Sequence, residues 1–335
     1  MFSDRSPRAA AVSLRYLCQI ALLLAAPSTT AQNSLISSSP EETANAQASS
    51  TEGQVDANWL ERGYATIDNR SDELATWVDS FFGHARDVQD EPRTTVRLRP
   101  QYEWDEQDGS DLKLKVTGKV HLPKASNRLS VVFSGEDGDF DEDFYDPGIA
   151  ANGDSAAGVQ YQVRRKKRSS AFLFAGVKSG PNVKVGARYR MENPLWADAR
   201  YRFSEEVFFV PGDGFTSLTR LDVDHALADN TLLRWANRLE WGEETRGGEW
   251  NTRVAFIRRY DQHTAFRTFA FVKGDTDPEL LRSRGLGFGL RRRLGRDWLF
   301  WEIEPRYAWR KRGTDQEREG IASVKLRLEM IVGER

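Results

Sequence analysis

The feature that most constrains the fold is a strict two-residue alternation of side-chain character, which begins near residue 93 and continues to the C-terminus. A β-strand places successive side chains on opposite faces, whereas a helix repeats every 3.6 residues. The segment 95–104 is therefore predicted to be a strand with one apolar and one charged face. Its two faces are Val96, Leu98, Tyr102 and Trp104 against Arg97, Arg99, Gln101 and Glu103.

The same pattern recurs along the chain in segments of about ten residues, the length that a tilted transmembrane strand needs. Clear examples are 112–122, 183–191, 197–203, 233–241, 299–309 and 324–332, and weaker ones are 128–136, 157–165, 170–178, 217–225, 250–260, 264–273 and 284–293. The sequence thus predicts an antiparallel β domain of about 12–14 strands. On the run 284–293, Gly285, Gly287 and Gly289 alternate, and we expect them to relieve crowding on the wall.

The connections between these segments alternate between short turns and longer polar stretches. Short turns are predicted at 123–127, 192–194, 229–230, 261–262 and 295–297, and longer segments at 137–156, 274–282 and 311–318. With both ends of the barrel in the periplasm, the longer segments are expected outside the cell.

Lipid is a better solvent for this sheet than water, although 39% hydrophobic residues and a mean hydropathy of −0.61 describe a soluble protein. A soluble sandwich must protect its edge strands, while one closed meander has none. Trp and Tyr also collect near predicted strand ends on the apolar face, as in the aromatic girdles of membrane proteins. We therefore predict an all-β, antiparallel up-and-down transmembrane β-barrel over residues 93–335.

The N-terminal region has a different character. Residues 1–31 read as a signal peptide, with Arg5, Arg8 and Arg15 before a short apolar run and small residues before Gln32. The only cysteine, Cys18, lies in this signal. Residues 32–57 are polar and are expected to form a disordered periplasmic tail.

A helical segment is predicted over residues 58–92, between the tail and the barrel. Its core is an amphipathic helix at 71–83, with Leu74, Trp77, Val78 and Phe81 at helical spacing. We favour its packing as a cover on the periplasmic rim of the barrel. The alternative is a plug or a docking handle for a partner.

The signal sequence, the absence of cysteine after it, the repeated strands and the amphipathic last strand together resemble Gram-negative outer-membrane β-barrel proteins as a class. The chain departs from that class by ending in Gly333-Glu334-Arg335 instead of an aromatic residue. The resemblance implies an outer-membrane location, contacts with lipid and lipopolysaccharide, and insertion by the outer-membrane assembly machinery. The net charge of −2 gives no reason to expect nucleic acid as a partner.

The charged face of the strands is expected to line the barrel lumen. It either pairs internally as a salt-bridge network or forms a narrow channel that prefers a small anionic solute. The predicted lumen residues are Arg97, Arg99, Lys113, Lys115, Arg188, Arg190, Arg200, Arg202, Arg234, Arg238, Arg306 and Arg310 with Glu103, Glu240, Glu302, Glu304 and Glu329.

Other sites are weaker. The acidic segment with Asp137, Asp139, Asp141 and Asp143 has oxygen ligands suited to Ca²⁺, but it lacks the spacing of an EF-hand loop. We expect a solvated loop there and no cofactor.

A catalytic alternative rests on Ser217, Asp222 and His225, the best collection of serine, histidine and acid in the sequence. It predicts a barrel enzyme acting on lipid or lipopolysaccharide, with Ser217 and His225 in hydrogen-bond reach on the lipid-facing wall. A soluble periplasmic β-protein is a third alternative. We favour a non-enzymatic barrel, either an anion-leaning channel or a structural, surface-exposed protein.

Overall fold

A computed structural model describes residues 73–82, 94–122, 126, 128–135, 156–166, 168–178, 183–196, 198–243, 245, 247–311 and 317–333. The predicted signal peptide, the polar tail and the acidic segment at 137–143 lie outside these residues. The strands are β1 (Thr95–Asp105), β2 (Gly109–His121), β3 (Leu129–Gly135), β4 (Ala156–Lys166), β5 (Ser169–Lys178), β6 (Val183–Trp196), β7 (Ala199–Val210), β8 (Gly214–Ala228), β9 (Thr231–Gly242), β10 (Gly248–Arg259), β11 (Thr264–Thr276), β12 (Glu279–Arg293), β13 (Leu299–Arg310) and β14 (Glu319–Gly333).

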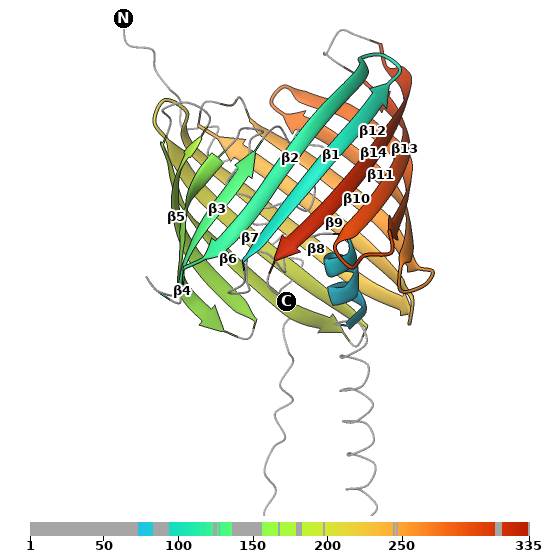
Figure 1. The fold of residues 1–335 in the computed structure, drawn as a ribbon. Helices are drawn as coiled ribbons and strands as arrows, with labels where there is room; N and C mark the ends of the chain where they lie inside the picture. Colours follow the sequence, from blue (N-terminus) through green and yellow to red (C-terminus); the bar gives the residue numbers. More distant parts are fainter. Residues whose placement is uncertain are drawn as a thin grey trace, which may run out of the picture. The chain divides into compact units, whose positions relative to one another are not determined.

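These strands form one closed antiparallel barrel in which each strand pairs with its neighbours in sequence (Figure 1). The seam is formed by β1 and β14, where Thr95 pairs with Gly333 and Asp105 with Ser323. Closure gives every strand two paired neighbours, so the sheet has no free edge strand, although β3 pairs only with Val116–His121 of β2. The predicted fold is confirmed, at the upper end of the predicted strand number.

The barrel has two rims. The start of β1 and the end of β14 lie at one, which we call the terminal rim, and the other is the far rim. Because strands alternate in direction, β3 and β13 end at the far rim. The long segments predicted after them therefore follow from that rim, as expected.

Two predicted connections are wrong. The segment 192–194 is part of β6, which reaches Trp196 with a register irregularity after Pro194. The segment 274–282 is mostly strand, since β11 reaches Thr276 and β12 begins at Glu279. The charged side chains of this segment contact one another, because Arg282 Nε donates to Asp275 Oδ2.

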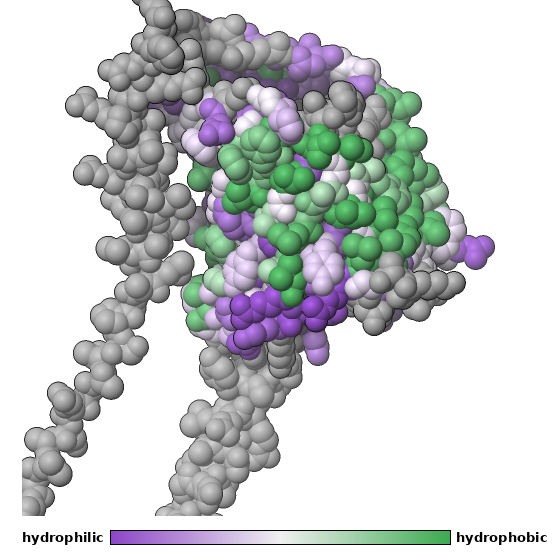
Figure 2. Space-filling view, turned by 90° about the vertical axis from the view of Figure 1, so that its left-hand side faces the viewer, coloured by the Kyte–Doolittle hydropathy of each residue, from purple (hydrophilic) through white to green (hydrophobic). Residues whose placement is uncertain are grey.

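Burial is inverted relative to a water-soluble protein. Large apolar side chains such as Leu114, Leu173, Trp235 and Leu326 are exposed on the outside of the wall, while arginines and glutamates are buried inside. Figure 2 shows one side of the barrel, where hydrophobic side chains gather above a hydrophilic lower edge. Such an exterior is stable in lipid. Among the described residues, no helix is long and apolar enough to cross a membrane.

The glycines on β12 make room for side chains of β11, as expected. A Cβ at Gly285 would come within 2.9 Å of the Phe271 ring, and one at Gly289 within 2.7 Å of Arg267 Nε. Since these positions face inward, the missing side chains leave space in the lumen for the large side chains of the neighbouring strand.

A helix at residues 73–81 packs inside the barrel, and we call it the lumenal helix. Its buried face shares one apolar cluster with inward-facing residues of the wall, among them Leu232, Ile257 and Phe300. Figure 1 shows it near the terminal rim. The favoured prediction of a cover on the rim is wrong, because the apolar face of the helix contacts the lumenal side of the strands, as the plug alternative requires.

We predict that Leu326→Arg lowers the free energy of unfolding by about 2–4 kcal/mol, because residue 326 lies at the middle of β14 on the lipid-facing side. The measurement is reversible urea unfolding from vesicles, followed by tryptophan fluorescence. The control for membrane depth is Leu112→Arg, near the far-rim end of β2, which should lower the free energy of unfolding by about 0–1 kcal/mol. Equal losses for both variants would contradict a lipid-facing belt.

Candidate functional site: the charged barrel interior

The barrel interior is charged because the polar half of every alternating strand points inward. Of the buried side chains among the described residues, thirteen are Arg or Lys and eight are Asp or Glu. A buried charge is tolerated only when it is paired or hydrogen-bonded. The interior is therefore a set of ion-pair clusters with an excess of basic groups.

The structure places the predicted lumen residues on the inner face of the wall. Those that are buried are Arg97, Arg99, Arg188, Arg190, Arg200, Arg234, Arg238, Glu302, Glu304 and Glu329. Lys113 and Lys115 share the inner face of β2 with buried Lys119 but are less buried themselves.

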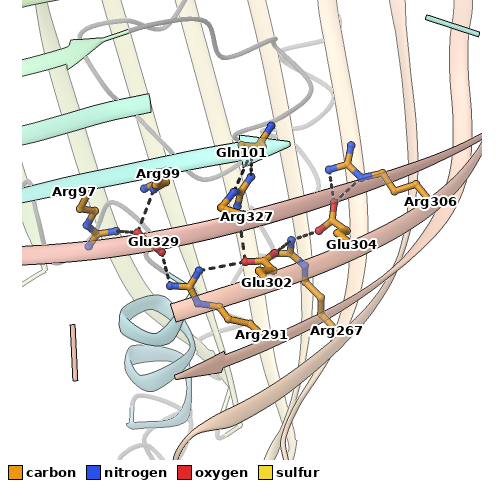
Figure 3. Close-up of polar contacts among 10 residues, drawn as sticks. All are labelled: Arg97, Arg99, Gln101, Arg267, Arg291, Glu302, Glu304, Arg306, Arg327 and Glu329. Carbon is orange, nitrogen blue, oxygen red and sulfur yellow. Dashed lines mark hydrogen bonds and ion pairs between the residues drawn. The ribbon is translucent and has the colours of Figure 1, made fainter. Parts of the chain in front are cut away.

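The first cluster surrounds Glu329 on β14 (Figure 3). Its carboxylate pairs with Arg97 Nη1 at 3.7 Å, with Arg99 Nε at 3.1 Å, and with Arg291 Nη2. Arg97 and Arg99 come from β1 and Arg291 from β12. One carboxylate therefore links both sides of the barrel seam.

Glu302 and Glu304 on β13 extend this cluster along the wall (Figure 3). Glu302 accepts hydrogen bonds from Arg291 Nη1 at 3.2 Å and Arg267 Nη2 at 2.5 Å. Glu304 accepts one from Arg306 Nε at 2.5 Å and also pairs with Arg267. The predicted Arg–Glu network is present on this part of the wall, from β11 to β14.

A second cluster ties the lumenal helix to the other side of the barrel. Asp79 of the helix is fully buried and accepts hydrogen bonds from Arg234 on β9 and Arg202 on β7, both at 2.7 Å. Arg234 also donates to Asp224 of β8 at 2.6 Å. The helix carboxylate is thus part of the ion-pair network of the wall.

The apolar side of the helix contacts β10 to β13. The Phe81 ring lies 5.6 Å from the Phe300 ring in an edge-to-face arrangement. Guanidinium groups lie over its other aromatics, with Arg259 5.1 Å from Trp77 and Arg267 5.2 Å from Phe82. Since its two sides contact different parts of the wall, the helix occupies the lumen as a plug.

The register of the sheet creates one further feature, which we call the basic ladder. It is a single line of directly paired inward positions that crosses the wall from β4 to β13, in which basic residues alternate with small polar ones except at the adjacent pair Arg220 and Arg238. In order it contains Arg165, Ser170, Arg190, Ser204, Arg220, Arg238, Asn251, Lys273, Ser283 and Arg310.

The basic ladder runs the length of the lumen. Paired positions lie perpendicular to the strands, and barrel strands are tilted, so a line of pairs climbs the wall. Arg165 is near the terminal-rim end of β4, and Arg310 is the last residue of β13 at the far rim. The next position on this line is acidic, because Arg310 pairs with Glu319 of β14.

Carboxylates lie beside several cations of the ladder, since Arg238 pairs with Glu240 at 3.1 Å and Arg310 with Asp105 at 2.7 Å. The charged neighbours of Arg220 include Arg238, Arg188, Arg190 and the carboxylate of Glu206. Glu206 is itself contacted by Arg188 Nη2 at 2.5 Å. Several cations of the ladder thus belong to the ion-pair network of the lumen, in which buried basic side chains outnumber buried acidic ones among the described residues.

The ladder was only partly predictable from the sequence. Arg190, Arg238 and Arg310 were predicted as lumen residues, whereas Arg220, Lys273 and Asn251 were missed. Arg220 and Lys273 lie on the weakly alternating segments 217–225 and 264–273, and the alternation alone does not tell which residues of distant strands are paired.

The predicted catalytic group is not assembled. Ser217 and His225 lie on the outer face of β8, eight residues apart, which separates them by about 26 Å. Asp222 faces the lumen, where Arg202 Nη1 is 3.5 Å from it. Ser217 instead donates a hydrogen bond to Glu205 Oε1 at 2.6 Å. The hypothesis of a Ser–His–Asp site is wrong, because alternation puts the acid on the opposite face.

No metal centre is seen in the part of the chain that the structure describes, where no group of three or more His, Cys, Asp or Glu side chains could hold an ion. The Ca²⁺ candidates Asp137, Asp139, Asp141 and Asp143 fall outside the described residues. They remain an expectation from the sequence.

Comparison with known proteins gives a likeness of architecture. No protein-family model matches the chain, and no curated protein sequence matches it. Similar solved structures include an anion-selective porin from Comamonas acidovorans, with 9% identity, 71% of this chain and 98% of that chain covered, and a TM-score of 0.44. The outer membrane channel DcaP of Acinetobacter baumannii has 7% identity, with 72% and 96% covered and a TM-score of 0.44. OccK11 of Pseudomonas aeruginosa has 10% identity, with 72% and 96% covered and a TM-score of 0.43.

These values say nothing about the solute or selectivity of this chain. The structure itself shows a closed 14-strand barrel with an apolar exterior and a charged interior. The class-level resemblance to outer-membrane β-barrels is confirmed at the level of architecture.

We predict that Asp79→Asn lowers the free energy of unfolding by about 3 kcal/mol, because it leaves Arg234 and Arg202 in the lumen without the charge of the helix carboxylate. Urea unfolding from vesicles measures the change. The control is Glu73→Gln, the same substitution type at an exposed position of the same helix, which should have no effect beyond about 0.5 kcal/mol. If both variants behave alike, Asp79 does not anchor the helix.

Proposed function

We propose that this protein is an outer-membrane channel of a Gram-negative bacterium that passes small anionic solutes along the basic ladder. The apolar outer wall supports a place in a membrane, and a barrel of this type belongs in the outer one. Export by a cleaved signal peptide, insertion by the outer-membrane assembly machinery, and contacts with lipid and lipopolysaccharide are parts of the same proposal.

The observation that carries the proposal is the continuity of the basic ladder from one rim to the other. An isolated buried arginine is explained by an ion pair, but structural pairing does not require cations at regular intervals over the whole length of a lumen. Rings or rows of Arg and Lys in a pore lower the energy of anions inside it and exclude cations. In a continuous row, an anion can contact the next basic side chain before it leaves the previous one.

Asn251 supports a path for solute along the part of the ladder between Arg238 and Lys273. It lies in the ladder between Arg238 and Lys273, and it is only 1% exposed. Neither Nδ2 nor Oδ1 of its amide makes a hydrogen bond to the described part of the protein. Buried polar groups are nearly always satisfied, so a passing solute or its water is a suitable partner for this donor and acceptor.

The ladder and the ion-pair clusters have different proposed roles. Glu302, Glu304 and Glu329 neutralise arginines on the β11–β14 wall and hold that wall together. The ladder crosses the wall from β6 to β10 at Arg190, Arg220 and Arg238 and continues over β11 to β13. We assign structure to the glutamate clusters and anion passage to the ladder.

The test is single-channel conductance of the folded protein in planar bilayers, with a salt gradient to read selectivity. The combined variant Arg190→Gln, Arg220→Gln and Arg238→Gln should shift the reversal potential from the anion side toward zero. The control is the pair Arg284→Gln and Arg292→Gln, which removes exposed cations of β12 from the outer face and should leave selectivity unchanged.

Two outcomes would contradict the proposal. A barrel that is folded by heat modifiability on gels yet shows no openings would favour a structural or surface-exposed protein with a filled lumen. An open pore whose selectivity is the same in the ladder variant and in the control pair would mean that the ladder does not line the path.

A further inference from the structure

The outer wall carries one carboxylate where lipid should be. Among the outward-facing positions of the described strands, Glu205 is the only acidic residue in the middle of a strand, since Glu279, opposite outward-facing Thr276, is the first residue of β12 at the far rim. It lies at the middle of β7, between the outward-facing Phe203 and Val207 on the same strand. Its position is therefore within the apolar belt and not at either rim.

Glu205 is held by hydrogen bonds to the neighbouring strand. Ser217 Oγ donates to its Oε1 at 2.6 Å, and Thr219 Oγ1 donates to its Oε2 at 2.7 Å. Both donors are outward-facing residues of β8. The carboxylate is thus fixed against the wall, and each oxygen has a further lone pair that can accept a hydrogen bond.

The polar surface continues onto β9 and β10. Thr252 Oγ1 donates to Asn237 Oδ1 at 2.8 Å, Asn237 Nδ2 donates to the backbone oxygen of Leu221 at 3.2 Å, and Trp235 Nε1 donates to Thr252 Oγ1 at 2.9 Å. The second N–H of Asn237 makes no hydrogen bond within the described residues. We call Glu205, Ser217, Thr219, Asn237 and Thr252 the outer polar patch.

Lipid cannot satisfy this patch. Acyl chains offer neither donors nor acceptors, so ionisable groups at membrane depth are costly unless they are covered by protein. Polar side chains in membranes are typically found where two protein surfaces meet and hydrogen-bond across the contact. The patch has the composition of such a contact.

The partner that this patch fits follows from the depths of Glu205 and Asn237 along the barrel axis. Glu205 pairs with Thr219, which pairs with Leu239, and along this line the wall climbs toward the far rim by about 6 Å over two strands. Asn237 precedes Leu239 by two residues, which brings it back toward the terminal rim by about 5 Å. Glu205 and Asn237 therefore lie at nearly the same depth, on either side of β8.

We propose that the outer polar patch is the contact between two copies of this chain. Copies in one membrane share their orientation, so a two-fold axis between them is parallel to the membrane normal and joins residues of equal depth. An axis beside β8 places Glu205 of each copy against Asn237 of the other. The free amide N–H meets the free carboxylate lone pair twice, and the surface is complementary to itself. This inference is independent of the channel function.

Disulfide cross-linking in lipid vesicles tests the contact. In a Cys18→Ser background, which removes the only thiol of the chain, Leu221→Cys places a thiol on β8 beside the axis. Leu326→Cys places one at mid-depth on β14, away from the patch, as the matched control. We expect dimer formation on mild oxidation for the first variant and none for the second.

Single-molecule photobleaching of dye-labelled protein in vesicles gives the equilibrium. Glu205→Leu and Asn237→Leu should each weaken dimerisation by about tenfold or more, since each removes both symmetric contacts. Heat modifiability on gels shows that each variant still folds. Leu114→Ala, on the exposed face of β2, is the control that should leave the dimer unchanged.

The proposal is overturned if the protein stays monomeric in vesicles, or if Leu221→Cys and Leu326→Cys cross-link equally. Dimers that persist in Glu205→Leu and Asn237→Leu would also overturn it, because they would form through another face. Conductance need not change in any of these variants, so failure here is separable from failure of the channel proposal.

Discussion

Pairing of β1 with β14 is the contact on which the remainder of the structure depends. Without it the backbone of both strands would be exposed to hydrocarbon, and no lumen would exist to separate the charged side chains from lipid. The charges in turn reinforce the seam, because Glu329 of β14 holds Arg97 and Arg99 of β1 from the inside. Backbone closure and interior ion pairing are thus two parts of one arrangement.

Much of the fold was predictable because alternation is a local property. The alternating faces of the segment 95–104 and of the last strand correctly predicted where these strands lie and which side chains point inward. This prediction does not depend on how each strand is paired with its neighbours. The error at 274–282 has a physical reason: charged residues at strand ends resemble a polar loop. Only the folded chain brings Asp275 and Arg282 together across adjacent strands.

The candidate site was less predictable, because it depends on which residues of different strands are opposite each other. The arginines of the ladder were recognisable one at a time as inward-facing. Their alignment with Ser204, Asn251 and Ser283 follows from the register of the strands between them, which side-chain pattern determines only weakly. The position of the lumenal helix was likewise hidden, since an amphipathic face shows that a helix packs but not on what.

The contacts of the lumenal helix have a mechanical consequence. A barrel wall is a single layer of strands, and such a tube is easily deformed from a round to an oval cross-section. Asp79 is tied to β7 and β9 on one side, while Phe81 packs against β13 on the other. The helix therefore acts as a cross-brace that fixes the separation of two parts of the wall near one mouth, and the width of that mouth becomes a property of the N-terminal segment as well as of the strands.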